Sequence, residues 1–439
     1  MSASAQNSEP WWEEAVTLCS ALIRHDTQLG GNGERRATEY AAKLLADVGL
    51  SPVLVESEPT RTSSVTRVPG EDPSLDPLLI HMHLDVVPAQ AHEWSVHPLS
   101  GEVRDGYVWG RGAVDMKNMA ASVLAVVRER MRTGRLPRRP LVLAFLADEE
   151  NAGVLGAEWL VRERRDLLEG CRTAIGEGGG WSVPVGDGHR IYPVHSAEKG
   201  WAALQVKATG RPQHASRVTD ANPLRVLGEA VGRLTTDRFP VHLTAEVELL
   251  LRRICDVSGV AFDPAHPETA CELAGFEREN LLSGLRNSAH ATWLSAGYQS
   301  NVIPGEATAE LDVRYLPGRW AEFLGQLHAA LGPDVEVTEL ARTFGLSPTS
   351  TSAESGVWAA TRAALRSEDA VAEVSPFMLS GGTDATHLQR LGIECFGFNP
   401  LLLPPDLDFW SLFHGVDERV PVDSLRFSAR VMDRFLDLY

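Results

Sequence analysis

The sequence predicts an α/β fold, with a large domain built on a central, mostly parallel sheet and a smaller α+β domain inserted into it. Short apolar runs at 78–80 and 141–147 do not alternate with polar residues, which is typical of strands covered on both faces. A helical pattern at 117–132 lies between these runs, as in a βαβ unit. Residues 306–315 instead alternate strictly, which predicts a half-exposed antiparallel strand.

Apolar spacing, caps and turn residues predict the individual elements. Helices are predicted at 11–24, 36–48, 117–132, 222–234, 246–255, 355–366 and 422–439. Strands are predicted at 52–55, 79–85, 141–147, 172–176, 201–209, 306–315, 334–340 and 394–398. The Ser, Thr, Pro and charged residues of 57–77 predict a loop or an irregular hairpin, and the polar residues 1–9 predict disorder. The mixed stretch 240–290 receives no role.

The order of these elements predicts three segments. Residues 1–198 form the first part of the large domain, residues 199–342 form the inserted domain, and residues 343–439 complete the large domain. The insert is predicted from its antiparallel strand pattern, and the βα pattern returns after it.

Composition excludes several classes of partner. The 439 residues carry a formal charge of −18, which disfavours nucleic acid and anionic membranes because both would repel the protein. The chain has no apolar run long enough to span a bilayer, and its start lacks the basic and apolar parts of a signal peptide. We therefore expect a cytoplasmic protein. The five scattered cysteines are expected to be reduced packing residues.

His83 and Asp85 follow the apolar run that begins at Leu78. Ligands of open α/β sheets bind just beyond the carboxyl ends of strands, and residues two apart project from one face of a continuing strand. The imidazole could bind a metal while the carboxylate holds its other ring nitrogen. A purely structural His–Asp pair is the alternative.

Four more carboxylates follow strands or precede helices. Asp115 stands between a glycine-flanked turn and a predicted helix, where it could bridge two cations or simply cap the helix. Glu149 and Glu150 end a buried strand, where they would repel each other unless cations neutralise them, although a solvated acidic loop is the alternative. Glu177 precedes three glycines, which leave room for a ligand. Oxygen and nitrogen donors of this kind suit zinc.

Nine sequence blocks carry a resemblance to one family. They are His-Met-His-Leu-Asp-Val-Val-Pro, Gly-Arg-Gly-Ala-Val-Asp-Met-Lys, Asp-Glu-Glu, Glu-Gly-Gly-Gly, Gly-Arg-Pro-Gln-His-Ala-Ser, Asn-Val-Ile-Pro-Gly-Glu, Asp-Val-Arg-Tyr-Leu-Pro-Gly, Gly-Gly-Thr-Asp-Ala and Phe-His-Gly-Val-Asp-Glu-Arg-Val. In this order they resemble the di-zinc amidohydrolases and exopeptidases that include succinyl-diaminopimelate desuccinylase, acetylornithine deacetylase, aminoacylase, glutamate carboxypeptidase and carnosine-type dipeptidases. The resemblance extends from about residue 10 to the end of the chain.

The resemblance implies two Zn²⁺ ions per chain, with Co²⁺ or Mn²⁺ as possible substitutes. Asp115 would bridge the two ions. His83 and Glu177 would complete one site, and Glu150 and His414 the other.

The catalytic roles follow from the same resemblance. Glu149 would be the general base, and Asp85 would orient His83. The peptide bond between Asp115 and Met116 is expected to be cis.

The resemblance also implies substrate-binding residues. His214 would polarise the scissile carbonyl, although by itself it is typical of a surface loop. Asn301 and Arg314 would hold the substrate, Arg314 by a forked pair with its carboxylate or, alternatively, only within a cross-strand ion pair. Gly382 and Thr383 would line the substrate site, while the neighbouring Asp384 could simply cap a helix.

The predicted function is zinc-dependent hydrolysis of an amide bond beside a free carboxylate, in an N-acyl amino acid or a short peptide. Deacylase and dipeptidase share all of these site residues, so both remain open. The tryptophans near 94, 109 and 410 fit an apolar pocket or the core equally well. The rival function is that of a non-catalytic metal-binding scaffold protein. The resemblance further implies that the insert is a lid and dimerisation domain of a homodimer, whose partner supplies His214.

Overall fold

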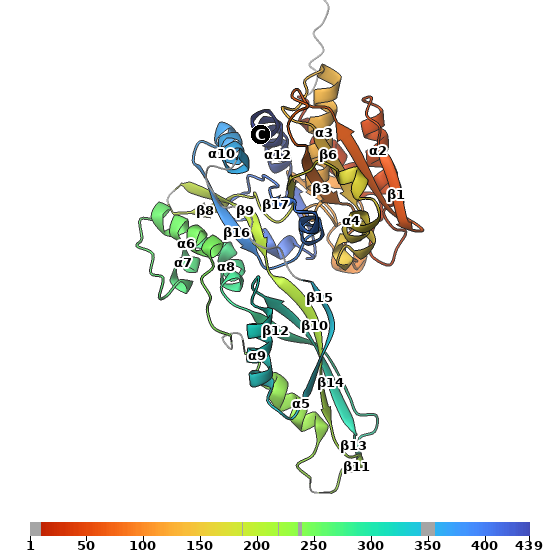
Figure 1. The fold of residues 1–439 in the computed structure, drawn as a ribbon, viewed down its shortest axis with the longest axis vertical. Helices are drawn as coiled ribbons and strands as arrows, with labels where there is room; N and C mark the ends of the chain where they lie inside the picture. Colours follow the sequence, from red (N-terminus) through yellow and green to blue (C-terminus); the bar gives the residue numbers. More distant parts are fainter. Residues whose placement is uncertain (1–9, 187, 218, 236–238, 344–355) are drawn as a thin grey trace, which may run out of the picture.

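A computed structural model describes residues 10–186, 188–217, 219–235, 239–343 and 356–439. A nine-stranded sheet forms the body, and a four-stranded sheet extends away from it (Figure 1). The predicted α/β class, with a mainly parallel central sheet flanked by helices, is confirmed.

The strands of the large sheet run in the order β1-β2-β6-β3-β7-β17-β9-β16, with β8 beside β9. Their bounds are β1 (Val53–Glu58), β2 (Arg61–Val68), β3 (Leu78–His83), β6 (Leu141–Leu146), β7 (Thr173–Gly176), β8 (Val183–Val185), β9 (His189–Glu198), β16 (Ala372–Leu379) and β17 (Glu394–Gly397). The neighbours β6, β3, β7 and β17 are parallel. Every residue of β3, β6 and β7 is buried, which explains why their apolar runs do not alternate.

Of the two structures that we predicted for 57–77, a loop or an irregular hairpin, the first half forms the hairpin, because β1 and β2 are antiparallel with a register shift near Glu58. Strand β2 pairs there with β1 on one side and β6 on the other. Its hydroxyl side chains are buried, and Ser63 accepts a hydrogen bond from the main chain of Ala147. Pairing on both sides satisfies the main chain, so tertiary contacts override the polar composition. We also did not predict β9 and β16.

One layer of helices covers a face of the large sheet. It consists of α1 (Glu13–Ile23), α2 (Arg35–Ala46), α3 (Lys117–Thr133), α10 (Gly356–Glu368) and α12 (Val422–Leu438). A second apolar core, on β1, β2, β6 and β7, is covered by the short helices α4 (Trp159–Glu163) and α11 (Ala385–Leu388). Two cores on one sheet hold its strands between layers of helices.

The four-stranded sheet is antiparallel in the order β12-β14-β10-β15. Its elements are β10 (Gly200–Thr209), β12 (Ser288–Ala296), β14 (Glu306–Tyr315), β15 (Glu336–Thr343) and the covering helices α5 (Pro223–Gly232) and α9 (Trp320–Leu331). The predicted alternation of β14 is confirmed, because its apolar residues from Ala307 to Tyr315 are buried. Asn222 caps α5 by accepting a hydrogen bond from the Leu224 amide.

Residues 240–290, to which we assigned no role, contain the helices α6 (Ala245–Val257), α7 (Glu268–Cys271) and α8 (Arg278–Gly284). Helix α6 packs against β9 and β16 of the large sheet, and its buried side chains belong to the same apolar core as Phe377. The chain therefore returns to the large sheet in the middle of the predicted insert. The limits 199 and 342 of that insert stay a prediction.

Two small sheets complete the structure. One contains β4 (Glu102–Arg104), β5 (Tyr107–Trp109) and β18 (Arg419–Pro421), and the other pairs β11 (Gln213–His214) with β13 (Val302–Ile303). All five cysteines are buried and free, as expected for packing residues. Within the described ranges, no helix combines the length and the apolar character that a bilayer crossing requires. The disorder predicted for residues 1–9 concerns residues outside those ranges.

Candidate metal centre

The predicted ligands come from loops that meet at one edge of the large sheet. His83 ends β3, Glu149 and Glu150 follow β6, and Glu177 follows β7. Because these three strands are parallel neighbours, their carboxyl ends lie side by side. Asp115 comes from the turn before α3.

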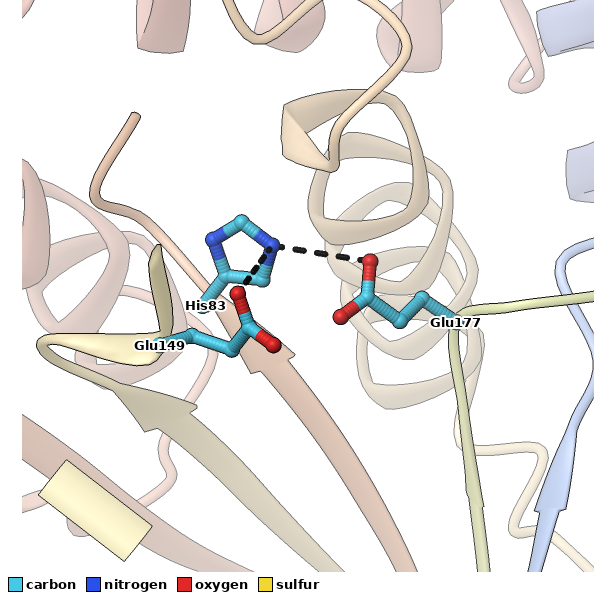
Figure 2. Close-up of side chains that lie close together, drawn as sticks. All are labelled: His83, Glu149 and Glu177. Atoms are coloured by element: carbon cyan, nitrogen blue, oxygen red, sulfur yellow. Dashed lines mark ion pairs between the residues drawn. The ribbon is translucent and has the colours of Figure 1, made fainter. Parts of the chain in front are cut away.

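Two groups of three side chains could each hold a metal ion. The first group is His83, Glu149 and Glu177, and within it the candidate ligand atoms lie within 4.8 Å of one another (Figure 2). The Nε2 atom of His83 is 3.5 Å from Glu177 Oε2 and 3.8 Å from Glu149 Oε2. All three side chains are at most 13% exposed, so this is not the solvated acidic loop that we considered as an alternative.

The second group is Asp115, Glu150 and His414. The Nε2 atom of His414 lies 2.9 Å from Glu150 Oε2 and 3.3 Å from Asp115 Oδ2. The other carboxylate oxygen of Asp115 lies 2.9 Å from His83 Nε2. Asp115 therefore stands between the two groups, as a bridging ligand must.

Asp115 does not cap the helix that follows it. The N-cap position of α3 is Met116, and no side chain caps this end. The peptide bond between the two residues is cis, which confirms our prediction.

Burial and like charges perturb the acidic groups of the centre. Burial, together with the nearby carboxylate of Glu177, raises the pKa of Glu149 well above its usual value. Burial raises the pKa of Glu177 to about 7. Burial also raises the pKa of Glu150, to which the charge of Asp115 contributes. These carboxylates destabilise one another when ionised, and bound cations would relieve that repulsion.

The pKa values of the two imidazoles are also raised, which in their case favours the charged form. Hydrogen bonds to Asp115 and Glu150 raise the pKa of His414 to about 10. The pKa of His83 is raised although its burial opposes the charge, because Glu177 and Asp115 lie close by. Protons on the imidazoles thus balance the carboxylates that a metal would otherwise neutralise.

The donor set fits two zinc ions. Each group supplies a nitrogen and two carboxylates, which are the ligands that zinc accepts. In addition, Glu150 Oε1 is buried and has no hydrogen-bond partner among the described residues. A buried carboxylate oxygen without a partner is costly unless a cation binds it.

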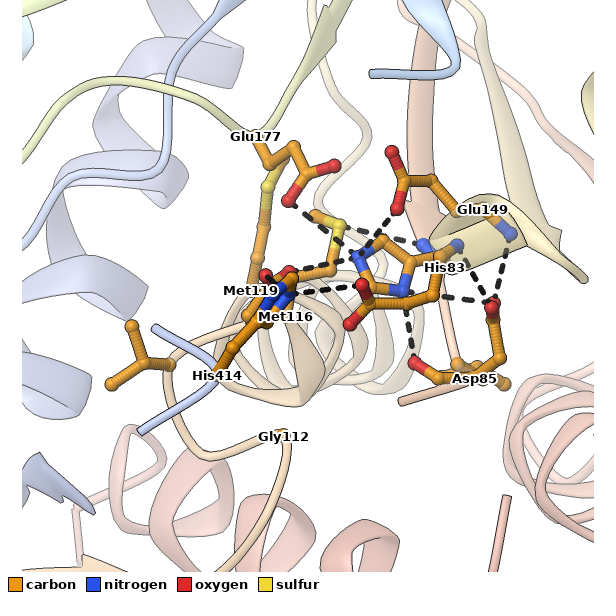
Figure 3. A network of polar contacts seen from close by, with 12 residues as sticks. His83, Asp85, Gly112, Met116, Met119, Glu149, Glu177 and His414 are labelled. Atoms are coloured by element: carbon orange, nitrogen blue, oxygen red, sulfur yellow. Dashed lines mark hydrogen bonds and ion pairs between the residues drawn. The ribbon is translucent and has the colours of Figure 1, made fainter. Parts of the chain in front are cut away.

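We expected the carboxylate of Asp85 to hold His83, but its main-chain oxygen does so instead (Figure 3). Strand β3 ends at His83, so the two side chains do not continue on one strand face. The main-chain oxygen of Asp85 accepts the hydrogen bond of His83 Nδ1 at 3.0 Å, whereas its carboxylate is 3.7 Å away. This carboxylate instead accepts hydrogen bonds from the amides of Glu149 at 3.2 Å and Glu150 at 3.0 Å. Asp85 therefore orients His83 and also fixes the Glu149–Glu150 turn.

Glu418 supports Asp115 and was not predicted, although it lies in one of the sequence blocks quoted above. Its buried carboxylate accepts hydrogen bonds from the amides of Gly112, Val114 and Asp115. It also binds the guanidinium of Arg111 at 2.8 Å. One side chain thereby satisfies three amides of the turn that presents Asp115.

A cavity of about 570 Å³ opens beside the metal ligands and includes Arg314, Gly382 and Thr383. Arg314 forms a forked pair with Asp312 of its own strand, at 2.8 and 3.2 Å, rather than a cross-strand pair. The hydroxyl of Thr383 donates to Glu198. Asp384 makes no side-chain cap, and it is buried at the cavity wall.

The cavity wall also contains residues that we did not predict, because their signal is tertiary. They are Trp181, Trp201, Asp312, Leu379, His387 and Phe413. Trp410 is among the wall residues, so the tryptophan near 410 belongs to a pocket, whereas Trp94 and Trp109 do not line it.

His214 and Asn301 are not brought to the metal ligands within the chain. His214 lies on β11, at the tip of the extension farthest from β3 (Figure 1). It is exposed, and its Nδ1 atom lies 2.8 Å from the hydroxyl of Ser216. Asn301 is beside it, since its main-chain oxygen accepts a hydrogen bond from Ala215.

An α/β sheet with two groups of candidate metal ligands at its strand ends is typical of a metal-dependent enzyme. Residues 79–438 match the family described as Peptidase family M20/M25/M40. The chain belongs to this family, and the resemblance on which our predictions rest is confirmed.

Two curated relatives align over nearly the whole chain. N-fatty-acyl-amino acid synthase/hydrolase PM20D1 of Xenopus tropicalis is 27% identical and covers 94% of this chain and 83% of its own length. Aminoacylase-1 of Sus scrofa is 26% identical, with 92% and 90% covered. Among solved structures, the M20 family metallo-carboxypeptidase Sso-CP2 from Sulfolobus solfataricus has the same fold, with a TM-score of 0.73 at 18% identity over 97% of this chain and 99% of that chain.

Proposed function

We propose that the protein is a di-zinc hydrolase that cleaves an amide bond beside a free carboxylate, in an N-acyl amino acid or a short peptide. The observation that carries this proposal is the position of Asp115 between two ligand groups, at the edge of a cavity large enough for such a substrate. The two relatives, an aminoacylase and an N-fatty-acyl-amino acid synthase/hydrolase, support the reaction class.

The ligands would divide between two ions. Asp115 would bridge them, His83 and Glu177 would complete one site, and Glu150 and His414 would complete the other. When bound, the zinc pair would lower the pKa of a water molecule and polarise the substrate carbonyl. Cobalt or manganese could substitute, because both accept the same donors.

Glu149 is the proposed general base. It shares the first ligand group with His83, and the hydrogen bond that its main-chain N–H donates to the Asp85 carboxylate fixes its position. Its carboxylate accepts a proton from the attacking water and later passes that proton to the leaving amine. An adjacent carboxylate, Glu150, faces the other group, so the two neighbours perform different tasks.

The substrate carboxylate is proposed to bind at Arg314. A guanidinium has five N–H donors, and two N–H groups of Arg314 bind Asp312, so an anion can bind beside that pair. Gly382 and Thr383 would line the other side of the substrate.

A homodimer would complete the site. His214 would polarise the scissile carbonyl of the partner's substrate, and Asn301 would help to hold it. Edge strand β12 supports this proposal, because most of its residues are exposed, among them Trp293 and Leu294 at 49% and 63%. An exposed apolar sheet edge favours pairing with a second copy. The cytoplasmic location stays a prediction.

A substrate screen tests the proposed function against the rival scaffold role. Purified protein with added zinc is offered N-acetyl and N-succinyl amino acids and dipeptides, and release of the free amine is measured. We expect hydrolysis of at least one class and none by Glu149→Ala. Equal release by both proteins, or no release from any substrate by a zinc-loaded dimer, would reject the proposal.

A further inference from the structure

Five aromatic rings form a cluster next to the metal ligands. Trp181 is its centre, and the centroid of its ring lies 6.2, 5.7, 5.3 and 6.4 Å from the rings of Phe377, Phe409, Trp410 and Phe413. Trp410 and Phe413 also stack on each other at 4.8 Å. Trp181, Trp410 and Phe413 line the cavity, and we call these three residues the aromatic wall.

The aromatic wall is directly connected to the proposed metal ligands. Phe413 immediately precedes His414, and Trp181 follows Glu177 after three glycines. Arg314 lies in the same cavity. A molecule bound there thus meets a cationic group, the metal ligands and an apolar aromatic surface.

A buried carboxylate orients both indoles of the wall. Glu277 lies between α7 and α8, in the stretch that returns to the large sheet, and it is 8% exposed. Its Oε1 accepts the Nε1–H of Trp181 at 3.0 Å, and its Oε2 accepts the Nε1–H of Trp410. Asn280 also donates to Oε2, at 3.3 Å.

A plain packing role does not require this arrangement. Burying a carboxylate is costly, and apolar contacts alone can hold aromatic rings in a core. Here two indoles that reach Glu277 from 96 and 133 positions away share one acceptor group, and both face the cavity. Their ring planes are thus fixed at the place where a substrate binds.

We propose that the aromatic wall is the subsite for a bulky apolar group of the substrate, and that Glu277 is its positioning residue. This inference rests on the proposed function and narrows the substrate class to amides that carry a large acyl chain or a large apolar side chain. Such a group buries apolar area against the rings and is stabilised by that burial, whereas an acetyl or alanyl methyl covers little of the surface.

The first experiment compares kcat/KM for N-acetyl-alanine, N-acetyl-phenylalanine and N-octanoyl-alanine. We expect the wild-type zinc enzyme to prefer at least one bulky substrate by about tenfold or more, as the burial of several methylene groups allows. The bulky substrate with the larger kcat/KM shows whether the amino acid side chain or the acyl chain contacts the aromatic wall. No preference for either bulky substrate would overturn the proposal.

The second experiment changes Glu277→Gln, with Glu272→Gln as the matched control. A glutamine oxygen can accept from both indoles only weakly, and its amide group faces one of the two N–H donors, so one ring is released. We expect kcat/KM for the preferred bulky substrate to fall about tenfold through KM, while that for N-acetyl-alanine stays within about twofold. Glu272 pairs with Arg278 at the surface, and its substitution should change neither value.

Trp410→Leu keeps the test informative if Glu277→Gln does not fold, because it removes one ring of the wall and should lower only the bulky-substrate value. Calorimetric titration of the zinc-loaded Glu149→Ala protein with N-octanoyl-alanine and N-acetyl-phenylalanine gives a readout without turnover. If at least one bulky ligand binds more tightly than N-acetyl-alanine does, and Glu277→Gln abolishes that difference, the result supports the subsite even if the proposed hydrolysis fails. Hydrolysis of N-acetyl-alanine with equal affinity for all three ligands would overturn the subsite and keep the proposed function.

Discussion

Glu418 accepts a hydrogen bond from the main-chain N–H of Asp115 at 3.2 Å, across 303 positions of sequence. The turn that presents the proposed bridging ligand is therefore held from the other end of the chain. The same carboxylate binds two further amides and the buried guanidinium of Arg111.

Replacing Glu418 should loosen both the fold and the metal centre. Glu418→Ala leaves a buried guanidinium and three amides without their acceptor, which typically costs about 3–5 kcal/mol. We expect a lower thermal-unfolding midpoint and a lower zinc content after dialysis. Glu418→Gln retains one acceptor oxygen, so its unfolding midpoint and zinc content should lie between those of Glu418→Ala and the wild type. An unchanged zinc content in Glu418→Ala would show that Asp115 needs no support from it.

Glu149 and Asp115 should separate catalysis from metal binding. Glu149→Ala should keep its metal and lose turnover, because the five proposed ligands remain while the proposed base is lost. Asp115→Ala should lose both, because the residue contacts both groups. Elemental analysis beside amine-release assays distinguishes these outcomes. Turnover by Glu149→Ala would place the base elsewhere.

The metal stoichiometry is a direct test of the centre. We expect about two zinc ions per chain, from the two groups of ligands. Chelation should abolish activity, and zinc or cobalt should restore it. Metal analysis that returns one ion or none under zinc-replete conditions would contradict the assignment.

Mixed dimers test whether His214 acts on the partner. Glu149→Ala and His214→Ala proteins, each inactive, are combined under conditions that exchange subunits. Random pairing makes half of the dimers hybrids with one intact site, so activity should recover to about a quarter of wild type. Recovery is measured as amine release, with exchange proven by differently tagged chains. Without recovery, His214 acts in its own chain or has no catalytic role, and a fully active monomer would refute the dimer.

Lys199 should make stability depend on pH. This buried residue lies between β9 and β10, and burial lowers the pKa of its ammonium to about 7 from 10.5. Between these two pKa values Lys199 is protonated in the unfolded chain but not in the folded one. The buried ammonium therefore lowers the free energy of unfolding fully below about pH 7, and this loss of stability disappears as pH rises towards 10.5. Relative to Lys199→Met, the wild type should therefore gain in thermal-unfolding midpoint between pH 7.5 and pH 9.5, roughly within that window. A constant difference would show that the ammonium is not destabilised by folding.

Much of the fold follows from local patterns. The buried strands β3 and β6, the helix α3 between them and the alternating β14 have the residues and limits that we predicted, to within a few positions. In each case apolar periodicity, together with the length and the flanking residues of the segment, distinguishes a covered strand, a helix and a half-exposed strand. At 57–77 the same local reasoning left a loop and an irregular hairpin open, because polar hydroxyl residues conceal the strand β2, whose second neighbour, β6, comes from far along the sequence.

The sequence by itself determined which side chains could bind metal, since His83, Asp115, Glu149, Glu150 and Glu177 stand at strand ends and helix starts, and ordered motif blocks extended the set to His414. The resemblance of the motif blocks also implied which ligands share a site, but only the tertiary structure brings them together, because the 2.9 Å contact between His414 and Glu150 joins residues 264 positions apart, as the difference between 414 and 150. The tertiary structure also decided that Glu418 supports Asp115 and that Glu277 orients two indoles. Contacts of this kind depend on the packing of distant elements and leave no periodic trace in the chain.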